Sequence, residues 1–115
     1  MVTVWVGLTK DEIAEINKAL KVLLNDRSKF PLYAGVNNTE QMRSRFLGLT
    51  LADGFVGVEI LKDRRSEENE TTVGMFVPET IAEAFSKYAE KIGVNVDDLY
   101  VSAFMHQADR LRRWA

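Results

Sequence analysis

The chain has 115 residues, of which 46% are hydrophobic and 28% are charged, and this size is typical of one globular domain. Fifteen basic and seventeen acidic side chains give a net charge of −2, which excludes a chain-wide basic surface for nucleic acid but not a local patch. The absence of cysteine excludes disulfides, thiolate metal sites and cysteine nucleophiles. No apolar run reaches the roughly 18 residues of a membrane span and no signal-peptide pattern is present, so we expect one cytoplasmic domain over residues 1–115.

The N-terminal segment predicts a strand followed by two helices. Valines at positions 2, 4 and 6 have the period of two that is typical of a half-buried strand. Thr9 and Glu12 are spaced as a capping box, so a helix is expected to begin there and to fade near Asn25. A short second helix is expected between an Asn38 cap and Gly48.

The middle of the chain predicts a β-hairpin. Asp53-Gly54 lies between the segments LGLTLA and FVGVEI, and this dipeptide favours a two-residue turn. Pairing across the turn would place six aliphatic residues on one face, which makes the register self-consistent. Residues 63–70 contain no apolar side chain and predict a solvated loop, a possible boundary between two halves of the domain.

The C-terminal segment predicts a strand and two more helices. Residues 72–77 alternate again, and Pro78 ends the strand. One helix is expected over 79–92 with Gly93 at its end, and another over 96–113 with Asn95 as its cap. No internal repeat is apparent. The expected order is β-α-α-β-β-β-α-α, an α+β fold with helices on one face of a small antiparallel or mixed sheet.

The segment TTVGMFVPETIAEAFSKYAEKIGVNVDDLYVSAFMHQADRLRR, residues 71–113, resembles a ribbon-helix-helix (Arc/MetJ-like) transcription factor. The resemblance implies a homodimer in which two strands form an antiparallel ribbon that enters the major groove of DNA. It implies that Thr72, Gly74 and Phe76 face the bases and that Asn95 begins the helix whose end meets a phosphate. The sequence departs from the family at the strand, because only Thr72 can hydrogen-bond to a base edge.

Two further groups are candidate contacts. The C-terminal arginines could bind nucleic acid beside Trp114, or could simply compensate the helix dipole: Arg110, Arg112 and Arg113. The face of the expected sheet opposite the valines carries aromatic and small residues, and we expect it to be an interface that includes Trp5, Thr50, Phe55 and Phe76. Its occupant is left open between the loop 25–37 or Trp114 of the same chain, a second copy, and another protein.

Catalysis is not expected. His106 is the only histidine, and Ser102 and Asp109 would lie on the same helix without a pocket. We expect no cofactor and no metal site, because adjacent Asp97 and Asp98 are better explained as helix-dipole partners.

The sequence therefore predicts a non-catalytic homodimeric regulatory protein that binds duplex DNA. The alternative is a protein-binding module, such as a small inhibitor or adaptor of plasmid or phage type, that uses the aromatic-glycine face. Neither interpretation involves a membrane. Whether strand 72–77 pairs within the chain or across a dimer stays open.

Overall fold

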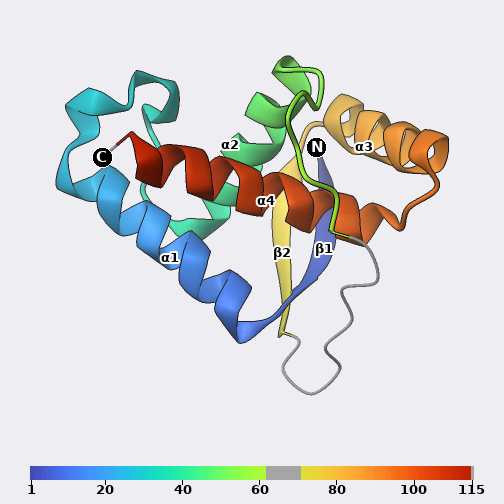
Figure 1. The fold of residues 1–115 in the computed structure, drawn as a ribbon, viewed down its shortest axis with the longest axis horizontal. Helices are drawn as coiled ribbons and strands as arrows, with labels where there is room; N and C mark the ends of the chain where they lie inside the picture. The colour runs from blue at the N-terminus through green and yellow to red at the C-terminus, as the bar shows by residue number, and fades with distance from the viewer. Residues whose placement is uncertain (62–70, 115) are drawn as a thin grey trace.

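The computed structural model describes residues 1–61 and 71–114 (Figure 1). It has an α+β fold in which a two-stranded antiparallel sheet packs against four α-helices. The strands and helices are β1 (Val2–Leu8), α1 (Lys10–Asn25), α2 (Thr39–Ala52), β2 (Thr71–Val77), α3 (Glu79–Ile92) and α4 (Val96–Arg113). Two short 3₁₀ turns, Arg27–Lys29 and Pro31–Tyr33, connect α1 to α2. Within the described ranges, no helix is long and apolar enough to cross a membrane.

The helix boundaries that rest on capping residues are confirmed. Thr9 and Glu12 form the capping box, because the Glu12 amide donates to Thr9 Oγ1 at 3.2 Å and the Thr9 amide donates to Glu12 Oε1 at 2.8 Å. At the other end of the chain, Gly93 ends α3 in the left-handed conformation at φ +74°. Asn95 caps α4 by accepting the Asp97 amide at 2.9 Å.

The predicted hairpin around Asp53-Gly54 is wrong, and the observed order is β-α-α-β-α-α. Helix α2 continues to Ala52, and Gly54 follows it at φ +64° with its amide donating to Leu51 O at 2.9 Å. An Asp-Gly pair suits a type I′ turn and the end of a helix equally well, because both need a positive φ. The segment is helical because its apolar residues are spaced to cover one face of a helix. Met42, Phe46 and other residues of that face are buried, whereas a strand would bury alternate leucines. The loop expected over 63–70 lies outside the described residues.

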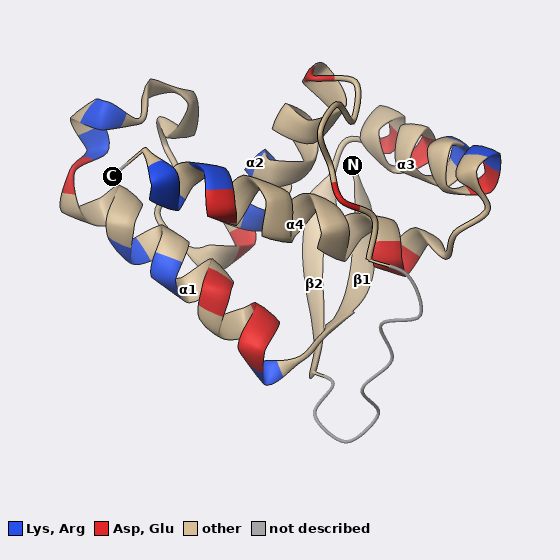
Figure 2. Ribbon diagram, viewed as in Figure 1, with Lys and Arg blue, Asp and Glu red and all other residues tan. Residues whose placement is uncertain are grey.

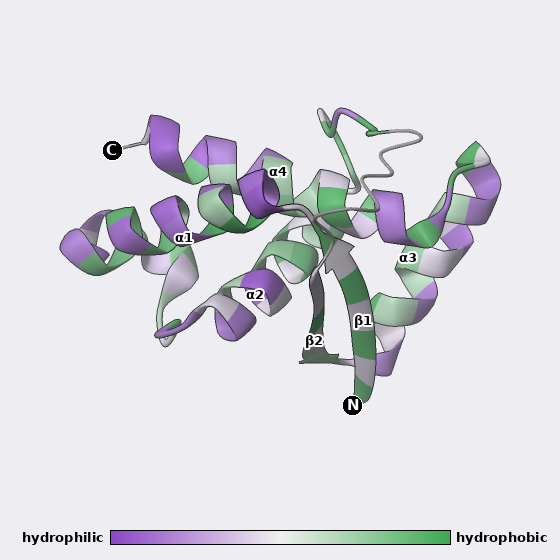
Figure 3. Ribbon diagram, turned by 90° about the horizontal axis from the view of Figure 1, so that it is seen from below, coloured by the Kyte–Doolittle hydropathy of each residue, from purple (hydrophilic) through white to green (hydrophobic). Residues whose placement is uncertain are grey.

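Strand β2 pairs with β1 of the same chain. The two strands pair in register from Val2 opposite Val77 to Leu8 opposite Thr71, with Trp5 opposite Gly74 at the centre. Figure 3 shows the strands side by side at one surface of the helical body. The open question about strand 72–77 is therefore answered in favour of an intrachain ribbon.

The chain is built from two units of the same order, β1-α1-α2 and β2-α3-α4. In each unit the strand has seven residues and one residue, Thr9 or Pro78, separates it from the first helix. The two strands face each other across the ribbon, and the packing is crossed: α2 contacts β2, and α4 contacts β1. Likewise α1 packs on α4 and α2 packs on α3. This crossed packing indicates an approximate two-fold axis.

The buried positions of the second helices also correspond. Asn38 and Asn95 cap these helices, and each residue buried in α2 has a buried counterpart at the same distance from the cap in α4. The pairs are Met42 and Leu99, Arg43 and Tyr100, Phe46 and Ala103, Leu47 and Phe104, and Thr50 and Gln107. Helix α4 also buries four residues without a buried counterpart in α2, which are Val101, Ser102, Ala108 and Leu111. The equivalent residues Thr50 and Gln107 meet, because Gln107 Nε2 donates to Thr50 Oγ1 at 3.1 Å. The repeat is one of burial and capping, not of residue identity, and for this reason the sequence did not reveal it.

Candidate functional site

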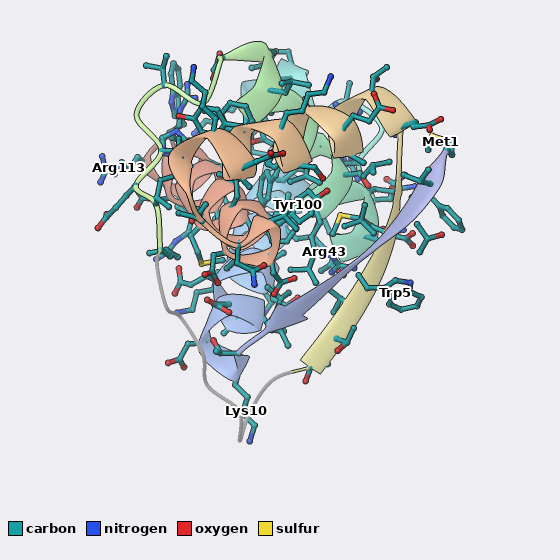
Figure 4. The ribbon with its side chains drawn as sticks, turned by 90° about the vertical axis from the view of Figure 1, so that its right-hand side faces the viewer. Met1, Trp5, Lys10, Arg43, Tyr100 and Arg113 are labelled. Atoms are coloured by element: carbon teal, nitrogen blue, oxygen red, sulfur yellow. The ribbon has the colours of Figure 1, made fainter. Side chains whose placement is uncertain are left out.

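The outer face of the ribbon is the candidate site. Alternate residues of both strands point away from the helices, and they are Thr3, Trp5, Gly7, Thr72, Gly74 and Phe76. Trp5 is 65% exposed and Phe76 is 59% exposed, although both are large apolar side chains. Figure 4 shows Trp5 directed away from the helical body. We call these six residues the ribbon face.

The centre of the ribbon face is a cross-strand pair of unequal residues. A Cβ atom built on Gly74 would lie 2.8 Å from Trp5 Cζ3, closer than such contacts occur. The indole therefore lies over the Gly74 backbone, and a side chain at position 74 would push the exposed ring outward. One side of the ring packs on the ribbon while the rest stays accessible.

Helix α2 fixes the free edge of β2. Arg43 Nη2 donates to Gly74 O at 3.3 Å, and Ser44 Oγ donates to Phe76 O at 3.0 Å. These carbonyls point away from β1, so the two side chains satisfy groups that the ribbon leaves unpaired. Arg43 is only 8% exposed, and burial lowers its pKa. Neither role could be predicted from the sequence, because both depend on contacts between α2 and β2 that form only in the folded chain.

The ribbon face carries no charge, and Figure 2 shows both strands without charged residues. The second helices, which flank the ribbon, have acidic first turns: Glu40 in α2, and Asp97 and Asp98 in α4. Glu40 lines an open groove that also includes Phe76. Any ligand of the ribbon face is therefore held by direct contacts with the strands rather than by long-range attraction of negative charge.

The structure separates the other predicted nucleic-acid contacts from the ribbon face. Arg110 pairs with Asp53 at 2.9 Å, Arg113 pairs with Asp109 at 3.0 Å, and Arg112 pairs with Glu15. Figure 4 shows Arg113 and Trp5 on opposite sides of the molecule. The arginines thus belong to the surface of α4 near its C-terminal end. Asn95 is occupied as the cap of α4.

Two predicted interface residues do not belong to the ribbon face. Thr50 is buried within α2, and Phe55 stacks on Tyr88 with ring centroids 4.1 Å apart. Both were assigned to the sheet only because of the expected hairpin. The loop 25–37 and Trp114, which were one of the alternatives for covering the face, lie elsewhere: Tyr33 is buried against Phe46, and Trp114 lines a separate cavity.

The described residues contain no cluster of three or more metal-ligating side chains. Ser102 is buried and its hydroxyl donates to Asp98 O at 2.7 Å while accepting the Leu61 amide at 2.8 Å. Its hydroxyl is therefore engaged with the backbone and not with His106. Burial, and secondly Arg110, lower the pKa of His106 below its ordinary value.

Comparisons of the chain with protein-family models, with curated proteins and with solved structures find no match.

Proposed function

We propose that this chain is a non-catalytic regulatory protein that binds duplex DNA through the ribbon face, as a single-chain counterpart of a ribbon-helix-helix dimer. One observation carries the proposal: two β-α-α units in one chain pair their strands into an antiparallel ribbon with the helices behind it. The resemblance rested on residues 71–113 alone and called for a second copy to supply the other strand. Residues 1–61 supply it, so the binding unit is one chain.

The dimensions of the ribbon suit the major groove, which is about 12 Å wide and admits a two-stranded ribbon. Thr3 and Thr72 are exposed and carry the hydroxyl groups of the face. Trp5 and Phe76 supply exposed apolar surface. Base edges offer both hydrogen-bonding groups and the thymine methyl group, so this set of side chains has partners in the groove.

Because the ribbon face has no basic residues, we expect its affinity for DNA to depend only weakly on salt concentration. Non-specific DNA binding comes from cations that displace counterions, and the slope of log K against log salt is about −0.9 for each phosphate neutralised. With no charge on the face and acidic helix N-termini beside it, we expect a slope shallower than about −3. Binding then depends on sequence more than on salt.

The test is selection from a pool of random duplexes, followed by titration of the enriched duplex. We expect Trp5→Ser/Phe76→Ser to lose at least about tenfold in affinity, since it removes both aromatic rings from the face. Trp114→Ser removes an equally exposed tryptophan elsewhere and should bind as the wild type does. If no sequence is enriched by the wild-type chain over the double variant, the proposal fails.

A protein target is the second candidate, favoured by the apolar character of the face. Met1, Trp5 and Phe76 are large hydrophobic residues that are each more than half exposed, and such residues anchor protein interfaces. A displayed library of random peptides tests this candidate. It predicts enriched peptides that bind the wild type and Trp114→Ser but not Trp5→Ser/Phe76→Ser; peptides that bind all three equally would contradict it.

A further inference from the structure

We infer that the ribbon face recognises an asymmetric duplex site, with thymines beneath Trp5 and Phe76 and one chain bound per site. The inference rests on the proposed DNA-binding function and adds the class of sequence. It follows from comparing the two strands position by position.

A symmetric dimer reads a palindrome, because its two-fold axis repeats the same contacts on both half-sites. Here Trp5 and Gly74 are both equivalent in the two units and opposite in the ribbon, so the approximate axis passes between them. Thr3 and Thr72 occupy equivalent positions and are identical. The third pair of equivalent positions holds Gly7 in β1 and Phe76 in β2. The threonines of the ribbon face therefore obey the approximate two-fold symmetry, whereas its aromatic residues break it.

The asymmetry at the centre of the ribbon face follows from how Trp5 packs on Gly74. The indole of Trp5 occupies the space above Gly74, where any Cβ would lie 2.8 Å from the ring. A second tryptophan at position 74 would have to displace the first. The centre of the face thus holds one large aromatic residue, and that residue belongs to β1.

The chemistry of the face favours thymine. Guanine is read mainly by arginine or lysine, adenine by asparagine or glutamine, and cytosine by carboxylates, and none of these lies on the ribbon face. The thymine methyl group is instead read by apolar contact. Trp5 and Phe76 offer such contact at the centre of the ribbon and at one end only. The threonine hydroxyls accept or donate, so they do not fix a particular base.

The test removes the methyl groups from the DNA, which leaves the protein fold untouched. In the selected duplex each thymine is replaced in turn by deoxyuridine, which lacks only the C5 methyl. We expect about a fourfold loss of affinity at each of two positions, since one buried methyl group is removed in each case. Phe76→Ala should abolish the dependence at one position, Trp5→Ala at the other, and Trp114→Ala at neither.

The selection separates failure of the inference from failure of the proposed function. A palindromic site, or two chains per duplex, would overturn the inference and leave DNA binding intact. Failure to enrich any sequence would overturn DNA binding itself. Uniform tolerance of deoxyuridine in an enriched site would show that the methyl groups are not read.

Discussion

Gly74 is the residue on which the geometry of the ribbon face depends most directly. Its lack of a side chain allows the Trp5 indole to lie across β2, and its carbonyl accepts from Arg43 on the other side of the strand. Substitutions at Gly74 therefore report on the ribbon face and on the packing of α2 together.

We predict that Gly74→Ala lowers the free energy of unfolding by at most about 1 kcal/mol, because the new methyl group displaces an exposed indole from its contact with β2. Chemical denaturation followed by circular dichroism measures the change. Gly48→Ala is the control. Its Cβ would meet only Ile81 Cδ1 at an ordinary 3.9 Å within a helix, so it should stabilise the chain by up to about 1 kcal/mol. Equal effects of the two variants would contradict the placement of Trp5.

His106 predicts a pH dependence of stability. Burial lowers its pKa in the folded chain below 6.5, its ordinary value, with Arg110 adding to the shift and Asp109 and Asp53 opposing it. Below pH 6.5 the unfolded chain binds the proton more readily, so stability falls as the pH drops from 6.5 through the folded-state pKa and then levels off. Above pH 6.5 the residue is neutral in both states.

Thermal unfolding measured between pH 7.5 and 5 tests whether the stability falls as the pH drops. The wild type should lose more stability over the range than His106→Gln, which has no titrating group at this position. A larger loss in His106→Gln would show that protonation of the histidine stabilises the fold, contrary to its surroundings.

At the scale of elements, local signals in the sequence were sufficient for three of the four helices. The capping box at Thr9, the cap at Asn95 and the left-handed Gly93 gave α1, α3 and α4 correctly. Helix α2 was predicted too short because Asp53-Gly54 serves helix ends as well as hairpins. The pairing of β1 with β2 had no local signal, since the partners lie in different halves of the chain.

Only those residues of the candidate site that depend on local patterns in the sequence could be predicted. Trp5 and Phe76 were identified because strand alternation alone sets which way they point. Thr50 and Phe55 were misplaced together with the hairpin. Arg43 could not be identified, because its role depends on a contact between α2 and β2 that only the tertiary structure creates.

The contact between α2 and α4 gives a prediction at this scale. Thr50→Val leaves the buried Gln107 amide without its partner and should cost about 1–3 kcal/mol. Thr50→Val/Gln107→Leu removes both polar groups and should recover part of that loss. A double-mutant cycle in the free energy of unfolding measures the coupling. Additive effects would show that these equivalent residues do not meet.

At the scale of the whole molecule, two β-α-α units share one ribbon and exchange their helix contacts. The two units have the same order of elements but differ in the residues of the ribbon face. The ribbon face has one tryptophan and one phenylalanine instead of two of each. The linker between the helices also differs: residues 26–38 in the first unit contain two 3₁₀ turns, whereas residues 93–95 suffice in the second.

The central claim, that one chain contains the complete ribbon and acts alone, is tested most directly by the molar mass in solution. Light scattering across a tenfold dilution should give 13.1 kDa for the free chain at every concentration. With the selected duplex it should give the mass of one chain added to one duplex. A stable species of twice the chain mass that persists on dilution, alone or on the duplex, would contradict the account.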